Sequence, residues 1–218
     1  MVERVRDQLI DIAERLSATR GVAAMTLRDV QVESGQRNKS VVQYYFGSRQ
    51  GLIEAVMDSR MGPINSRRLK ILERLGDEPE LRQLVGALVC PLADVAIGGT
   101  GSYWARFLLQ GSFDPTVRDL VRASFAASSF RAVRAELISR LESVPPEVRT
   151  HRVDRTVEFM LVALASAEEA RNAGRLGDAA ASRYVADLLD MCCAMLTAPA
   201  TWAVPASGAG SPAAAAEA

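Results

Sequence analysis

Residues 35–49 concentrate side chains that bind nucleic acids, and the segment contains no carboxylate. Arg37 and Lys39 can pair with phosphates, whereas the amide of Gln43 can form two hydrogen bonds to one base edge. The hydroxyl of a tyrosine such as Tyr44 can donate to a phosphate oxygen. This composition predicts a surface that contacts a polyanion.

The whole chain, by contrast, carries no net charge, because its 218 residues include 26 basic and 26 acidic ones. A nucleic-acid surface must therefore be a local patch, which argues against indiscriminate binding. Cys90, Cys192 and Cys193 make an odd number of thiols without metal-ligand spacing, which is typical of a reduced, intracellular protein. Because the sequence has no secretory signal and no long apolar run, we expect a cytoplasmic protein without a membrane partner.

Catalysis has little support in the sequence. His151 is the single histidine, and no glycine-rich phosphate loop or group of Asp, Glu and Cys residues at ligand spacing occurs. We therefore expect no enzymatic activity, no cofactor and no metal site.

The segments around the polar stretch have the outline of a helix-turn-helix unit. An amphipathic helix is predicted over residues 2–20 and ends at Gly21. Thr26 then begins a short helix, with Asp29 in capping-box position, and this helix ends near Gly35. A further helix begins at residue 38 or 39 and runs to residue 45 or 46.

The remainder also reads as helical, so the predicted fold class is all-α. A long helix begins at residue 49, and Gly62 and Pro63 should kink it or divide it in two. Further helices are predicted over residues 79–96, 102–110, 114–143, 147–173 and 178–196. We divide the chain into a helix-turn-helix domain (1–48), a second helical domain (49–197) and a disordered tail rich in Ala, Pro and Gly (198–218).

The first domain resembles the DNA-binding domain of the TetR family of transcriptional regulators. The resemblance covers roughly residues 5–56, and Gly21, Thr26, Phe46 and Arg49 match the family pattern. The stretches that carry it are residues 27–30 (LRDV), Gly35, and residues 43–52 (QYYFGSRQGL). Two departures stand out: the turn around residues 36–38 is one residue longer than usual, and Gln43 replaces the usual tyrosine.

The resemblance implies a recognition helix in the major groove of double-stranded operator DNA. Its N-terminal end would face the bases, Gln43 would read adenine, and Thr26 with Arg28 would contact the backbone. Asn38 is either a base contact or a helix cap, and one residue of the neighbouring tyrosine pair is packed rather than facing DNA. The full candidate set is Thr26, Arg28, Gln36, Arg37, Asn38, Lys39, Ser40, Gln43, Tyr44, Tyr45 and Arg49, whereas Val30, Val41, Val42 and Phe46 belong to the core.

The second domain is expected to bind a small hydrophobic effector and to form a homodimer. Its aromatic residues are either lining for a ligand cavity or simply core. The candidate ligand-binding residues are Tyr103, Trp104, Arg106, Phe107, Leu108, Gln110 and Phe125. The last two helices are too apolar for a monomer surface and predict the dimer interface. The predicted function is a repressor released by its ligand from a palindromic operator; the alternative is a ligand-independent repressor or architectural protein.

Overall fold

The computed structural model describes residues 2–38, 40–124 and 128–201, and every regular element in these ranges is an α-helix, as predicted. Lys39, Phe125 and the part of the predicted tail after residue 201 lie outside the described residues. The helices are α1 (Val2–Arg20), α2 (Leu27–Glu33), α3 (Val41–Phe46), α4 (Arg49–Leu75), α5 (Leu81–Ile97), α6 (Trp104–Phe113), α7 (Arg118–Ser124), α8 (Ser128–Arg140), α9 (Pro146–Asn172) and α10 (Asp178–Thr197).

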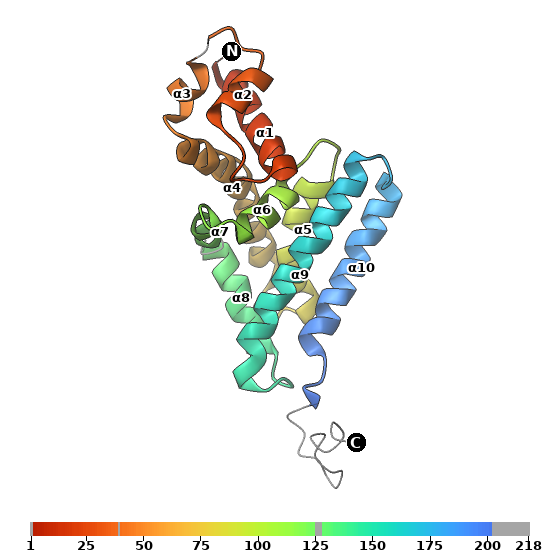
Figure 1. Ribbon diagram of the computed structural model, residues 1–218. Coiled ribbons are helices and arrows are strands. Elements are labelled where there is room, and N and C mark those ends of the chain that lie inside the picture. Colours follow the sequence, from red (N-terminus) through yellow and green to blue (C-terminus); the bar gives the residue numbers. More distant parts are fainter. Residues whose placement is uncertain (1, 39, 125–127, 202–218) are drawn as a thin grey trace, which may run out of the picture.

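The helices form a small head and a longer body (Figure 1). Helices α1, α2 and α3 make up the head, and α4 runs from the head into the body. The body is a bundle in which α5 packs against α4, α8, α9 and α10. Helix α6 lies at the junction, where it contacts α1 of the head and α9 of the body.

The start of α2 is the predicted capping box. The backbone N–H of Asp29 donates to the Thr26 hydroxyl, and the backbone N–H of Thr26 donates to the Asp29 carboxylate, both at 3.1 Å. These two bonds satisfy N–H groups that a helix start leaves free. Gly35 follows α2 with φ +63°, a conformation that costs other residues strain, so the predicted turn is confirmed.

Two predicted helix boundaries differ in the structure. Helix α4 continues through Pro63, so its division at that residue is wrong. Buried contacts of the following turns, such as Ile64, hold the helix together despite the lost backbone hydrogen bond. The helix predicted to begin at residue 114 begins at Arg118 instead, because the Asp114 carboxylate forms a turn by accepting a hydrogen bond from the Thr116 N–H (2.8 Å). Helix α8 ends at Arg140 rather than at residue 143, and residues 125–127 between α7 and α8 lie outside the described residues.

Helix α6 contributes two large aromatic side chains to the core. Trp104 and Phe107 are fully buried, and their rings stack with centroids 5.5 Å apart. Leu84 on α5 and Leu164 on α9 are also fully buried in this core. Helix α6 is thus fixed by apolar packing on the body side and lies against the head on the other.

Within the described ranges, no helix is both long and apolar enough to cross a membrane. The same ranges contain no group of His, Cys, Asp and Glu side chains that could hold a metal ion.

Replacing Thr26 by alanine removes the side-chain half of the capping box. We expect the free energy of unfolding to fall by about 1 kcal/mol, because a donor at the start of α2 loses its partner. Urea unfolding of Thr26→Ala and Thr26→Ser measures this, and the serine variant should retain most of the stability. Equal losses in both variants would show that the hydroxyl does not cap α2.

Candidate nucleic-acid interface

Helix α3 has a buried face and an exposed face. Val41 and Val42 are buried with Val30 of α2, and Phe46 packs at the edge of this core beneath the Arg6 guanidinium, 5.7 Å from the ring centroid. Gln43 and Tyr44 lie on the exposed face. The four apolar residues were predicted as core, and their burial orients the polar side of α3 toward solvent.

The two neighbouring tyrosines have different environments. The Tyr44 side chain is 81% exposed, whereas Tyr45 is half-buried and packs against the core. Their rings meet edge to face with centroids 5.3 Å apart. Tyr45 therefore corresponds to the packed member of the pair, and the Tyr44 hydroxyl is the one free to reach a phosphate.

The turn before α3 is longer than predicted, because α3 begins at Val41 rather than at residue 38 or 39. Arg37 and Asn38 are exposed there, and the Asn38 side-chain oxygen accepts a hydrogen bond from the Ser40 N–H at 3.0 Å. This bond closes a local turn just before α3, whose N-cap residue is Ser40, so Asn38 is not the helix cap. The Gln36 carbonyl accepts from the Gln31 amide at 3.1 Å, which ties the turn to α2.

Gln43, the predicted adenine reader, donates its amide to the backbone carbonyl of Gly47 at the end of α3. The side chain is exposed, so rotation about its own side-chain bonds can break this bond and free the amide. Its contact with a base stays a prediction.

The Arg49 guanidinium is turned into the head. Its Nε donates to the carbonyl of Met25 at 2.9 Å, and one terminal nitrogen donates to the carbonyl of Val22. These bonds fasten the loop between α1 and α2 to the start of α4. A phosphate contact by Arg49 stays a prediction, as do those of Thr26, whose hydroxyl caps α2, and of the exposed Arg28.

The predicted ligand-binding residues of α6 lie mostly in the core. Trp104, Phe107 and Leu108 are fully buried, the Arg106 guanidinium lies 4.7 Å from the Tyr103 ring centroid, and Gln110 is exposed. Their burial favours the alternative that these aromatic residues are core.

A cavity of about 540 Å³ opens beyond the end of α6, between α7, α8 and α9. None of the predicted ligand-binding residues of α6 is among its lining residues, which are Ser112, Phe113, Arg118, Val121, Arg122, Phe130, Asp154, Val157, Glu158 and Leu161. The predicted set was placed on α6 because of its aromatic residues, whereas the residues that line this cavity come from the end of α6 and from α7, α8 and α9.

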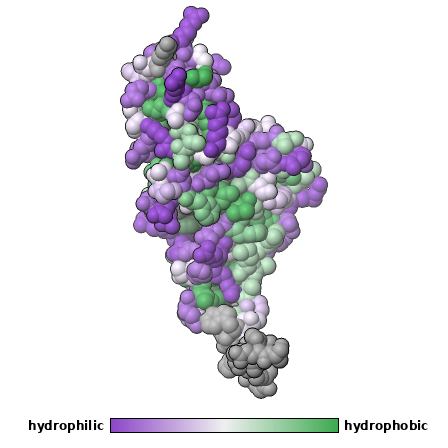
Figure 2. Space-filling view, in the orientation of Figure 1, coloured by the Kyte–Doolittle hydropathy of each residue, from purple (hydrophilic) through white to green (hydrophobic). Residues whose placement is uncertain are grey.

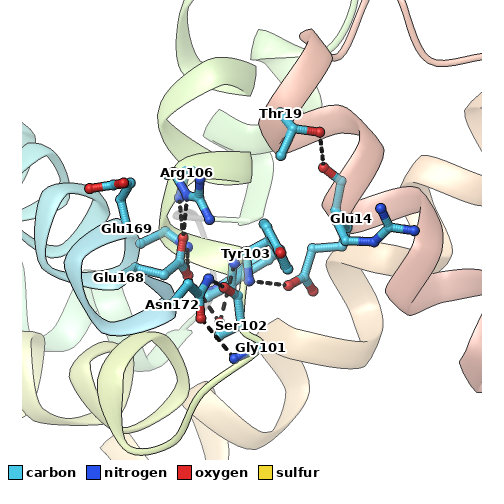
Figure 3. Close-up of polar contacts among 12 residues, drawn as sticks. Glu14, Thr19, Gly101, Ser102, Tyr103, Arg106, Glu168, Glu169 and Asn172 are labelled. Atoms are coloured by element: carbon cyan, nitrogen blue, oxygen red, sulfur yellow. Dashed lines mark hydrogen bonds and ion pairs between the residues drawn. The ribbon is translucent and has the colours of Figure 1, made fainter. Parts of the chain in front are cut away.

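Two buried carboxylates meet the start of α6 from opposite sides (Figure 3). Glu14 of α1 accepts a hydrogen bond from the Tyr103 N–H at 2.9 Å. Glu168 of α9 accepts from the N–H groups of Ala105 and Arg106 at 2.9 and 3.1 Å. Because these N–H groups form the positive end of α6, the carboxylates bind there favourably and join the head to the body.

Glu14 also pairs with α4, since the Arg60 Nε lies 2.6 Å from its second oxygen. Arg60 bridges to Asp11 at 2.6 Å as well. Burial raises the pKa of Glu14 above its usual range despite the opposing effects of Arg60 and the Tyr103 N–H; the nearby Glu168 charge raises it slightly further. Three helices, α1, α4 and α6, therefore share one nearly inaccessible carboxylate.

Solved structures with the same architecture identify the fold. A protein from Chloroflexus aurantiacus J-10-FL, described as a TetR transcriptional regulator, superposes with a TM-score of 0.56 at 15% identity, over 91% of this chain and 96% of that one. The chain has the TetR-family fold. A protein from Rhodococcus sp. assigned to the TetR family of regulators gives 0.50 at 16% identity, over 87% of this chain and 99% of that one.

The structural similarity extends well beyond the sequence resemblance, which was limited to the head and the start of α4. In the TetR-family fold, α2 and α3 form the helix-turn-helix and the later helices form the second domain. No protein-family model matches the sequence, and no curated protein matches it significantly.

The raised pKa of Glu14 predicts a pH dependence of stability. The folded protein holds the proton of Glu14 more tightly than the unfolded chain does. Protonated Glu14 therefore stabilises the fold below the ordinary pKa of 4.5, and this stabilisation is lost as the pH rises through the raised pKa of the folded state. In Glu14→Gln this loss is absent. The free energy of unfolding of the variant relative to wild type should therefore increase from pH 4.5 to pH 7.

Urea unfolding at the two pH values measures this difference. Glu33→Gln, which alters an exposed carboxylate paired with Arg15, is the control and should show no comparable increase. If the free energy of unfolding of Glu14→Gln relative to wild type stays constant or decreases as the pH rises, the pKa of Glu14 is not raised.

Proposed function

We propose that the protein is a sequence-specific DNA-binding transcriptional regulator. The observation that carries this proposal is the head itself: an acid-free turn and helix expose Arg37, Gln43 and Tyr44, while the opposite face of α3 is buried. Arginine and glutamine can read base edges in the major groove, and tyrosine can hold the backbone. The TetR-family fold supports the same function, because both solved neighbours are described as regulators.

A homodimer through α9 and α10 completes this proposal. Val162 on α9 is 50% exposed and Met191 on α10 is 45% exposed. They border a surface hollow of about 250 Å³ that Phe159 and Tyr184 also line. Figure 2 shows apolar surface over these two helices. A two-fold axis here would cover the apolar face and present two heads to a palindromic operator.

The polar network at α6 supports a route from ligand to DNA. A small hydrophobic molecule in the 540 Å³ cavity would contact the end of α6, and the start of α6 is bonded to α1 through Glu14. A ligand that prefers one position of α6 would thereby favour one position of the head. Such a ligand lowers DNA affinity only through its differential affinity for the two states.

A second contact lies at the other end of α6. The Asp114 carboxylate lies near the backbone N–H of Ala23 in the head, which helps to lower its pKa. Burial alone would raise the pKa of Asp114, but hydrogen bonds from Thr116 and the charge of Arg49 lower it below its usual range. Asp114 is therefore a charged link between the cavity-side loop and the loop that Arg49 fastens to α4.

Replacing Gln43 by alanine should weaken binding to the specific operator by about 1–3 kcal/mol, because a base contact is lost. Arg37→Ala should weaken it by a similar amount. Gel shifts with the DNA upstream of the protein's own gene measure this, with and without candidate hydrophobic molecules. Gln110→Ala, an exposed amide in the body, is the matched control. Wild-type affinity in the Gln43→Ala protein would refute its role; operator binding that no candidate molecule alters would favour a ligand-independent regulator.

Replacing Val162 by aspartate should break the proposed dimer, since a two-fold interface buries the new charge twice. Sedimentation should then show monomers, and the affinity for the operator should fall because the dimer is lost. Leu69→Asp places the same charge at an exposed leucine of α4 and should leave the dimer intact. A dimeric Val162→Asp protein would place the interface elsewhere.

A further inference from the structure

The most unusual charge in the body is Arg68 on α4. Its side chain is fully buried, yet among the described residues no carboxylate compensates its charge. Burial alone lowers the pKa of Arg68, to about 10, so the guanidinium remains charged at neutral pH. A buried charge without a counter-ion is costly, and an apolar side chain of similar volume would avoid that cost.

The hydrogen bonds of Arg68 leave one nitrogen unused. Nε donates to the Ala87 carbonyl at 3.1 Å, and Nη1 donates to the Asn65 side-chain oxygen at 2.9 Å and to the Ser129 hydroxyl at 3.4 Å. Nη2 is buried and has no hydrogen-bond partner. The guanidinium fork thus presents a free donor and an uncompensated positive charge, which is the chemistry that an oxyanion requires.

This charge lies next to the 540 Å³ cavity. The Phe130 ring lines the cavity, and the Arg68 guanidinium carbon lies 5.8 Å from the centroid of the same ring. The Phe130 ring therefore neighbours both the Arg68 guanidinium and the cavity, whose apolar lining includes Val121, Val157 and Leu161. Rotation of a phenylalanine side chain is a small, rapid motion compared with the movement of a helix.

The cations at the cavity rim are different. Arg118 and Arg122 are exposed, and each lies 3.9 Å from Asp119. Water and this one carboxylate already satisfy much of the charge of both arginines, so neither would bind an added anion strongly. Arg68 is the cation near this cavity whose charge the described residues leave uncompensated.

We infer that the cavity binds an apolar molecule bearing a carboxylate, and that Arg68 pairs with this carboxylate once the Phe130 ring turns aside. The inference rests on the proposed function in taking the cavity as the effector site. The apolar part of the ligand would occupy the space between α7, α8 and α9. Arg68 and Arg60 are both on α4, and Arg60 pairs with Glu14 of the head. The charge of the ligand would therefore act on a helix that is bonded to the head.

Matched acid and alcohol pairs test the inference on the full-length protein. Decanoate and 4-phenylbutyrate, both below any micellar concentration, are compared with decanol and 4-phenylbutanol by thermal unfolding and by titration. Wild type should bind at least one acid about 10–100-fold more tightly than its alcohol, the effect of one charge-assisted hydrogen-bonded pair. A wild type that binds acid and alcohol equally, or binds neither, overturns the inference.

Arg68→Met should abolish this preference while leaving the melting temperature of the free protein equal or higher, because the buried charge is removed. Arg122→Met should keep the preference. A preference that survives in Arg68→Met, or that is lost in Arg122→Met, overturns the assignment to Arg68.

A measurement on wild type alone covers the case in which Arg68→Met fails to fold. The ¹³C shift of carboxyl-labelled decanoate reports its protonation when bound. Pairing with Arg68 should keep the bound carboxylate ionised below the pH at which free decanoate takes up its proton. Protonation at a higher pH than in water overturns the inference. DNA binding is assayed separately. A protein that binds an operator but shows no preference for acids would contradict only this inference, whereas a protein that prefers acids but binds no operator would contradict only the proposed function.

Discussion

The architecture depends on the positive end of α6, which two buried carboxylates hold from opposite sides. Glu14 belongs to the head and Glu168 to the body, and each accepts backbone N–H groups that the start of α6 leaves unpaired. Removing either carboxylate would leave buried donors without partners. The orientation of the head relative to the body is therefore set by directed hydrogen bonds as well as by apolar contacts, and a small displacement of α6 must change both.

Among the described residues, the buried charges divide into those that are satisfied and one, Arg68, that is not. Glu168 accepts four hydrogen bonds, including one from the Arg106 side chain, and Glu14 has Arg60 beside it. Arg68 has only neutral partners and an unused nitrogen. Satisfied buried charges specify an arrangement of helices, whereas the unsatisfied one is retained at a cost in stability. Glu14 and Glu168 thus belong to the framework of the fold, whereas Arg68 is a candidate ligand contact.

Short-range signals made the head predictable from sequence. The capping box of Thr26 and Asp29 and the positive-φ turn at Gly35 involve residues close together in the chain, and both are in the structure. The body was less predictable because distant contacts decide it. Packing carries α4 through Pro63, and the bond from Tyr103 to Glu14 joins residues 89 positions apart. Local sequence also gave no sign that Gln43 would turn back to Gly47.

The central claim is that two copies of α3 read one operator. Hydroxyl-radical footprinting of the full-length protein on a genomic fragment that it selects tests this most directly. We expect two protected half-sites on one face of the DNA, related by a two-fold axis and separated by about one helical turn or a multiple of it. Protection spread evenly along the fragment, or a single protected site without symmetry, would contradict it.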